Sequence, residues 1–170
     1  MTMEKISSVF PIILAIILLA SFPTSGQAAE TIKLGVTEPL SGTFKNIGDR
    51  YLEGVRYAAK VLNRQGGVLG RQIEVIPVDS ELKADVATRK ATALILKDQV
   101  KFFCGGTGSS VGAAMSTVAE QNNAIMFSYG MDAASLTGAK CSKNFFRPGT
   151  NTDMHSYALA AYVAKSKFKK

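Results

Sequence analysis

The stretch FFCGGTGSSVGAAMSTVAEQ, residues 102–121, holds the residues best suited to chemistry in this chain of 170 residues. An apolar run leads into a glycine-rich turn, which two serines and a helical pattern follow. Gly106, Gly108 and Gly112 have the spacing GxGxxxG, a loose relative of a dinucleotide-binding fingerprint. Gly108, Ser110 and Gly112 form GxSxG, the nucleophile elbow of hydrolases. A third interpretation is a helix N-terminus whose free amides bind a small anion.

The two enzymatic interpretations need partners that the sequence supplies poorly. Ser110, Asp132 and His155 occur in the chain order of an α/β-hydrolase triad. His155, however, falls within a predicted helix, where a lone histidine is more often a surface residue than a base. A dinucleotide fingerprint belongs after the first strand, whereas these glycines follow the third. The anion cradle needs less, because Ser109 and Ser110 can add hydroxyl donors; capping of the helix without any ligand is the alternative.

The elements that must position this turn alternate between strand and helix. Strands are predicted at residues 32–37, 73–78, 100–104, 124–128 and 144–147. Helical spacing predicts helices around residues 51–62, 83–98, 111–118 and 152–164, with a short helix at 133–137. Gly66-Gly67 is expected to end the first helix in a left-handed cap, and Pro77 indicates an edge position or the end of its strand. Repeated strand-helix-strand units predict an α/β fold with a doubly wound parallel sheet.

In such a sheet, ligands bind beyond the carboxyl ends of the strands, near a topological switch point. Three predicted loops leave those ends, at residues 38–48, 105–110 and 129–133. A strand order of 2-1-3-4-5 would place the first and third strands at the switch point. Ser41, in the first of these loops, is therefore a further candidate ligand-binding residue.

Residues 1–29 do not fit this fold. Lys5 precedes the short apolar run Ile12–Ala20, and small residues follow up to Ala28-Ala29. The run is shorter than the roughly 20 residues that span a bilayer, so we expect a signal peptide cleaved after Ala28 or Ala29, with a retained anchor as the alternative. The formal net charge of +7 is spread along the chain without interleaved aromatic residues, which argues against nucleic-acid binding.

Two cysteines and one histidine provide no metal-binding spacing, and no metal or other cofactor is expected. Export favours oxidation of Cys104 and Cys141 to a disulfide. Cys104 lies in an apolar, strand-like run and Cys141 in a polar loop, so the pairing depends on geometry that the sequence leaves open.

Long stretches of the chain together resemble one family. They are IKLGVTEPLSGTFKNIGDRYLEGVRYAAKVLNRQGGVLGRQIEVIPVDS, GGTGSSVGAAMSTVAEQNNAIMFS, LTG and FFRPGTNTDMHSYALAAYVA. In order and spacing they resemble the type I periplasmic substrate-binding proteins of ABC importers, in the leucine/isoleucine/valine-binding branch. The resemblance implies two α/β lobes that close on a ligand without catalysing a reaction. It also implies a periplasmic, monomeric protein that binds an amino acid or a similar small polar solute and meets the membrane subunits of an importer.

The resemblance also implies roles for particular residues. The serine turn after the third strand would hold the ligand carboxylate through Ser109 and Ser110. The turn after the fourth strand would offer a backbone carbonyl and a side-chain oxygen to the ligand ammonium at Gly130 and Asp132, where Asp replaces the usual Thr or Ser. Ile47 occupies the position where the family often has an aromatic residue against the ligand. Both departures leave the identity of the ligand open.

The same resemblance divides the chain into parts. Residues 30–149 correspond to the first lobe, and residues 150–170 to the start of a second lobe that is otherwise absent. We therefore expect this chain alone to bind a ligand weakly or not at all. Two alternatives stay open: an amide- or urea-sensing domain of the same fold, and a secreted serine hydrolase that uses Ser110.

Overall fold

The structure is a computed structural model that describes residues 30–166. The predicted signal peptide, residues 1–29, lies outside the described residues. Contacts divide the chain after Glu30, and every element below belongs to the second unit. Its five strands form one parallel sheet, as predicted, and their order is β2-β1-β3-β4-β5, the order that would place β1 and β3 at the switch point. Their bounds are β1 Ile32–Glu38, β2 Ile73–Asp79, β3 Phe102–Gly105, β4 Ile125–Ser128 and β5 Phe145–Phe146.

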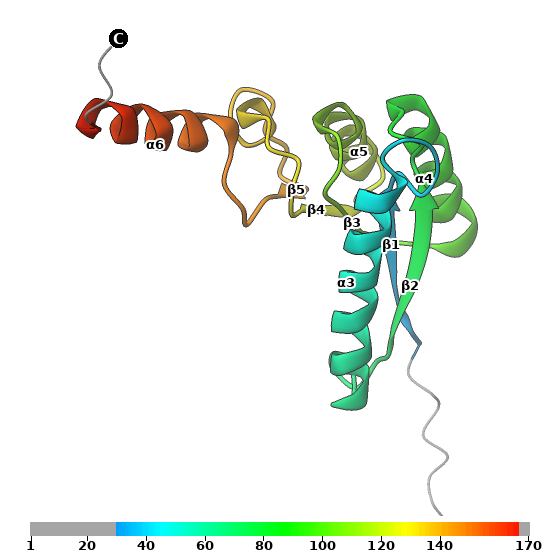
Figure 1. Cartoon of the computed structure of the whole chain (residues 1–170). Helices are drawn as coiled ribbons and strands as arrows, with labels where there is room; N and C mark the ends of the chain where they lie inside the picture. Colours follow the sequence, from blue (N-terminus) through cyan, green and yellow to red (C-terminus); the bar gives the residue numbers. More distant parts are fainter. Residues whose placement is uncertain (1–29, 167–170) are drawn as a thin grey trace, which may run out of the picture. The chain divides into compact units, whose positions relative to one another are not determined.

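Helices connect the strands in the predicted order (Figure 1). They are α3 Lys45–Arg64, α4 Ala84–Asp98, α5 Ser109–Gln121 and α6 Thr152–Lys165, with the short 3-10 helix η1 Ala134–Thr137. Helix α3 covers one face of the sheet, and α4 and α5 lie side by side on the other (Figure 1). The prediction of an α/β doubly wound parallel sheet is thereby confirmed.

Each face of the sheet has its own apolar core. Because successive side chains of a strand point to opposite faces, Phe103 packs with Met115 of α5, whereas Cys104 packs with Leu52 of α3. The larger cluster lies under α4 and α5, and it includes the fully buried Met126 of β4. These two cores hold the sheet, and therefore the carboxyl ends of its strands, in place.

The ends of two elements confirm what glycine and proline predict. Gly67 donates its amide to the carbonyl of Leu62 (2.9 Å) and Gly66 to that of Asn63 (3.1 Å), with φ of 78° and 101°. These two bonds are the Schellman pattern that closes a helix. Pro77 lies in β2, which is an edge strand and ends two residues later.

Several predicted boundaries were wrong. The loop predicted at 38–48 is shorter, because Glu38 still pairs with β2 and α3 already begins at Lys45. The first turns of α3 are largely exposed and lack the apolar stripe from which the helix was predicted. Ile47 therefore lies in α3 and not in a loop. Strand β3 begins at Phe102, two residues after the predicted start, and β5 has only two residues.

The cysteines are not paired in this structure. Cys104 is buried and Cys141 is exposed, and both are free thiols. No helix among residues 30–166 is long and apolar enough to cross a membrane.

Candidate functional site

The turns after β1, β3 and β4 lie at the same edge of the sheet. Strand β1 pairs with β2 on one side and with β3 on the other, so the chain reverses its direction of travel across the sheet between β1 and β3. This is the switch point, where open α/β sheets bind ligands. The amide of Tyr129 donates to the carbonyl of Gly105 (3.2 Å), which holds the β4 turn beside the β3 turn.

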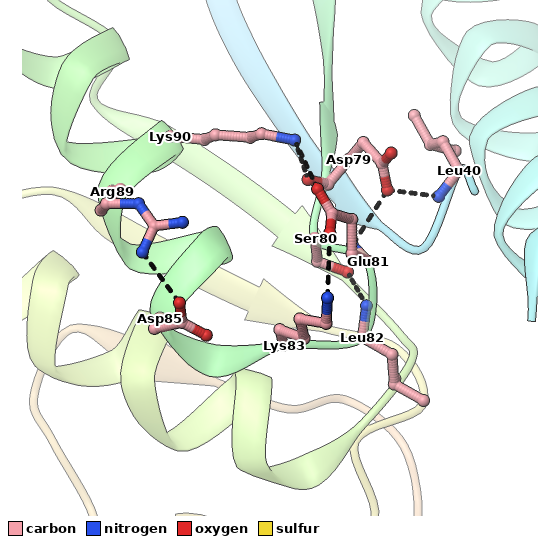
Figure 2. Close-up of polar contacts among 9 residues, drawn as sticks. All are labelled: Leu40, Asp79, Ser80, Glu81, Leu82, Lys83, Asp85, Arg89 and Lys90. Atoms are coloured by element: carbon pink, nitrogen blue, oxygen red, sulfur yellow. Dashed lines mark hydrogen bonds and ion pairs between the residues drawn. The ribbon is translucent and has the colours of Figure 1, made fainter. Parts of the chain in front are cut away.

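The first loop, which carries Ser41, is held by the end of β2. The Asp79 carboxylate accepts hydrogen bonds from the amides of Leu40 and Glu81 (2.9 Å each) and from the hydroxyl of Ser41. Figure 2 shows the carboxylate between the first two of these partners. Partial burial on its own would raise the pKa of Asp79. The hydrogen bonds and the nearby charge of Lys90 outweigh this effect, so the net result is a lowered pKa. Asp79 therefore stays ionised and fixes the Ser41 loop.

The turn after β2 supports the serine turn from behind. Glu81 and Leu82 have φ of 51° and 56°, a conformation that costs non-glycine residues about 1–3 kcal/mol. Ser80 stabilises it, since its hydroxyl accepts from the amide of Leu82 (3.2 Å) and its carbonyl from that of Lys83 (2.8 Å), as Figure 2 shows. A Cβ on Gly108 would lie 2.7 Å from Leu82 Cδ1, so the two turns are in close contact.

The two serines at the start of α5 have different environments. Gly108 is the N-cap residue, and no side chain caps the helix. The capping alternative for the serines is therefore wrong. Ser109 Oγ accepts a hydrogen bond from the amide of Ala133 (3.2 Å), which joins α5 to the turn after β4. Ser110 is exposed, and its hydroxyl bonds to no other described residue. The first amides of a helix have no intrahelical acceptor, so this end of α5 offers donors.

The turn after β4 is held from two sides. Arg147 donates to the carbonyls of Met131 (3.1 Å) and Ala133 (2.8 Å). The amide of Thr152 in α6 donates to the carbonyl of Asp132 (2.9 Å). The Asp132 carbonyl is thus already engaged, and its side-chain carboxylate, which is half-buried, is the group left to meet a ligand. Gly130 packs so tightly that a Cβ would lie 2.9 Å from the carbonyl oxygen of Gly106.

Glu38, at the carboxyl end of β1, is a central residue of this edge that was not predicted from the sequence. Its side chain is 0% exposed. One oxygen accepts from the Gly106 amide and the Tyr129 hydroxyl (2.6 Å each), and the other from the Thr107 hydroxyl (2.5 Å). Burial raises the pKa of Glu38 although these bonds lower it in part. The available signal was a carboxylate that directly ends an apolar strand, IKLGVTE.

Ile47 lies on the exposed first turns of α3, where its side chain is 44% exposed. Tyr51 lies one turn further along α3. The centroid of its ring is 4.9 Å from that of Tyr129, in the turn after β4. The role that the resemblance implies for Ile47 stays a prediction. Tyr51, an aromatic residue of α3 next to the turn after β4, is not among the ligand-binding residues predicted from the sequence.

The hydrolase triad is not assembled. His155 Nε2 lies 2.6 Å from the Thr150 hydroxyl, and among the described residues no hydrogen bond joins it to Ser110 or Asp132. No group of three potential metal-binding side chains occurs among residues 30–166.

Fold and site together define a class: an α/β lobe whose polar turns gather where doubly wound sheets bind ligands. Residues 31–170 match the family of periplasmic binding proteins. The chain belongs to that family, which confirms the resemblance seen in its sequence.

Three proteins are similar to this chain over most of its length. A leucine-, isoleucine-, valine-, threonine- and alanine-binding protein of Pseudomonas aeruginosa is 27% identical over 95% of this chain and 42% of its own length. A periplasmic binding protein of Burkholderia mallei is 28% identical, with a TM-score of 0.73 over 81% of this chain and 36% of its own. A solute-binding protein of an ABC transporter from R. palustris, in complex with benzoate, is 27% identical, with a TM-score of 0.72 over 82% and 38%. The chain thus spans about two fifths of the length of these relatives.

Proposed function

We propose that this chain contributes the first lobe of an extracytoplasmic solute-binding protein of an ABC importer. Residues 30–149 make up that lobe, and residues 150–170 begin the second. The ligand is an amino acid of the branched-chain type or a similar small polar solute. Family membership supports this proposal, as does the relative named for binding leucine, isoleucine and valine. The protein binds and delivers its ligand without catalysing a reaction.

One observation carries the proposal: the exposed start of α5 lies against the turn that carries Asp132. The bond from the Ala133 amide to Ser109 Oγ joins these two turns. Ser110 directly follows Ser109, and Asp132 directly precedes Ala133. The helix amides and the Ser110 hydroxyl suit a carboxylate, and the Asp132 carboxylate suits an ammonium. An amino acid carries both groups on one carbon, which matches two opposite partners on adjoining turns.

The remaining candidate residues shape this site. Gly130 provides close backbone approach beside Asp132. Ser41, which Asp79 holds in place, and Ile47 of α3 complete the proposed set of ligand-binding residues. The donors come from one edge of one sheet, whereas ligand pockets usually bury most of the ligand surface. We therefore expect the 170-residue chain alone to bind with a Kd of about 1 mM or weaker, about −4 kcal/mol.

The same proposal covers location and partners. Residues 1–29 act as a cleaved signal peptide, and the mature protein works as a monomer in the periplasm. It delivers its ligand to the membrane subunits of the importer. The family's name, periplasmic binding protein, supports this location.

A carboxylate without an ammonium is a second candidate ligand. The similarity to the solute-binding protein that holds benzoate favours it, because benzoate needs only the anion-binding half of the site. The two candidates differ in their need for Asp132, so a pair of substitutions separates them.

A titration followed by amide NMR tests the proposal. L-Leucine should shift the amides of residues 109–111 and 130–133 at millimolar concentration, whereas L-leucinamide, which lacks the carboxylate, should not. Ser110→Ala should weaken the response to leucine and to benzoate, and Asp132→Ala the response to leucine alone. Shifts spread over other parts of the sheet, or none with any of the three compounds, would contradict the site. Micromolar affinity by calorimetry would contradict the expected weak binding.

A serine-reactive fluorophosphonate decides the hydrolase alternative. We expect no labelling of the chain, because among the described residues no histidine is hydrogen-bonded to Ser110. Stoichiometric labelling that disappears in Ser110→Ala would replace the binding function by an enzymatic one.

A further inference from the structure

The buried carboxylate of Glu38 connects three strand ends that are remote in sequence. Its partners Gly106, Thr107 and Tyr129 are 68, 69 and 91 residues away along the chain. Gly106 and Thr107 belong to the turn after β3, and Tyr129 begins the turn after β4. Glu38 itself is the last residue of β1. A single side chain thus reaches both turns of the proposed ligand site.

This carboxylate is held by uncharged donors only. Among the described residues no lysine or arginine forms an ion pair with Glu38. The titratable groups near it are the Tyr129 and Cys104 side chains, whose pKa values the Glu38 charge helps to raise, and Tyr51, whose ring is tilted by 43° against that of Tyr129. Burial of an unpaired charge is unfavourable unless hydrogen bonds compensate for it. A buried carboxylate adds nothing to apolar core packing. It does, however, join the turns after β3 and β4 through its hydrogen bonds.

The amides after β3 form the kind of concave donor group that binds anions. The Gly106 amide, the Thr107 amide and the Thr107 hydroxyl all donate to Glu38. The chain's own carboxylate therefore occupies the first half of the glycine-serine turn. Only the second half, from Ser109 onward, is left for a carboxylate from outside. A second anion at Gly106 would also meet the Glu38 charge.

We propose that Glu38 is a positioning residue that also limits where a ligand carboxylate can bind. It fixes the turns after β3 and β4 to the end of β1, and it excludes an external carboxylate from the amides of Gly106 and Thr107. The carboxylate is thereby confined to the start of α5 at Ser110. The second half of this statement rests on the proposed ligand-binding function; the first half does not.

Hydrogen exchange of the full chain tests the positioning role without any ligand. Glu38→Ala should speed exchange at Gly106, Thr107 and residues 130–132 by at least about tenfold, since each loses a buried partner or the tie to β1. Exchange in β2 and α4 should stay unchanged. Glu38→Gln keeps one acceptor oxygen and should restore part of the protection. Glu74→Gln, an exposed acid on β2, is the matched control and should change neither turn. Uniform acceleration, or none at the two turns, overturns the positioning role.

Sodium acetate is the probe for the exclusion. In the unmodified chain, acetate should shift only the amides at residues 109–111. In Glu38→Ala, it should also shift Gly106 and Thr107, where the donors are now vacant. Equal acetate responses in both proteins overturn the exclusion. If leucine binds to neither protein while the exchange and acetate patterns hold, the proposed amino-acid function fails and the role of Glu38 stands.

A pH titration of the unmodified chain, followed by amide NMR, tests the role of Glu38 even if Glu38→Ala does not fold. The Gly106 amide proton should move with the ionisation of Glu38, with a midpoint above 4.5, because the pKa of the buried carboxyl is raised. Glu38→Gln should abolish this movement, and Glu74→Gln should preserve it. A Gly106 signal that is insensitive to pH in the unmodified chain overturns the proposal.

Discussion

The two adjacent serines at the start of α5 differ in their hydrogen-bond partners. The sequence predicts Ser109 and Ser110 as equivalent donors for a carboxylate. In the structure Ser109 accepts from the Ala133 amide, whereas Ser110 is exposed and unbonded among the described residues. Neighbouring positions on a helix point about 100° apart, and only the placement of the β4 turn decides which one is engaged internally. The sequence predicts that both serines are candidate donors, but it does not predict which of them is hydrogen-bonded within the protein.

Glu38 was missed for a related reason. A charged residue at a predicted boundary between strand and loop is normally solvated, so a carboxylate that ends an apolar run does not by itself indicate burial. Its partners Gly106, Thr107 and Tyr129 become neighbours only when β1, β3 and β4 are aligned in the sheet.

The two cysteines should differ sharply in reactivity. Burial, together with the nearby charge of Glu38, raises the pKa of the Cys104 thiol to about 12, so at pH 8 almost none of it is thiolate, the reactive form. Cys141 is exposed. We expect a maleimide to label one thiol per native chain at pH 8 and two in denaturant. Cys141→Ser should remain unlabelled until it unfolds; rapid labelling of that variant under native conditions would show that Cys104 is accessible.

At the scale of elements, the patterns with strong periodicity were predicted well. The alternation of strands and helices and the parallel pairing follow from short connections and apolar runs. The strand order does not follow from them, because these patterns do not say which strands are neighbours. The start of α3 could not be found in the same way. Its first turns carry polar and exposed residues, and they are fixed by contact with Pro39 rather than by an apolar stripe.

Two glycines of α3 provide a matched test of that contact. A Cβ on Gly48 would lie 2.1 Å from the carbonyl oxygen of Pro39, whereas a Cβ on Gly54 meets nothing within 4 Å. We expect Gly48→Ala to destabilise the protein by about 1–3 kcal/mol, as overpacking does. Gly54→Ala should stabilise it by about 0.5–1 kcal/mol, because alanine favours the helix. Urea unfolding measures both changes; a stabilising Gly48→Ala would mean that the helix and the loop are not in contact as described.

At the scale of the whole molecule, the described residues separate into a packed sheet and a helix with little burial. The sheet, α3, α4 and α5 share two apolar cores, whereas α6 has no buried residue. The sequence predicted the bounds of α6 closely. In the structure Asn151 caps this helix, because its side-chain oxygen accepts from the Met154 amide (2.9 Å). It could not predict what the helix packs on, because helical spacing predicts the element without identifying its partner.

Removal of α6 should therefore have little effect on the stability of the sheet. We expect a chain ending at residue 149 to keep its Tm within about 3 °C, since less than about 1 kcal/mol of burial is lost. The lost contacts are the bonds of Thr152 to Asp132 and Ala134, so the turn after β4 should exchange its amides faster. Thr152→Ala is the matched control, because it removes the hydroxyl bond to Ala134 and leaves the helix. Calorimetry and hydrogen exchange follow the two effects separately. A fall in Tm of more than about 8 °C would show that α6 belongs to the cooperative core, in which case its exposed Tyr157 and Leu159 would have a partner within this chain.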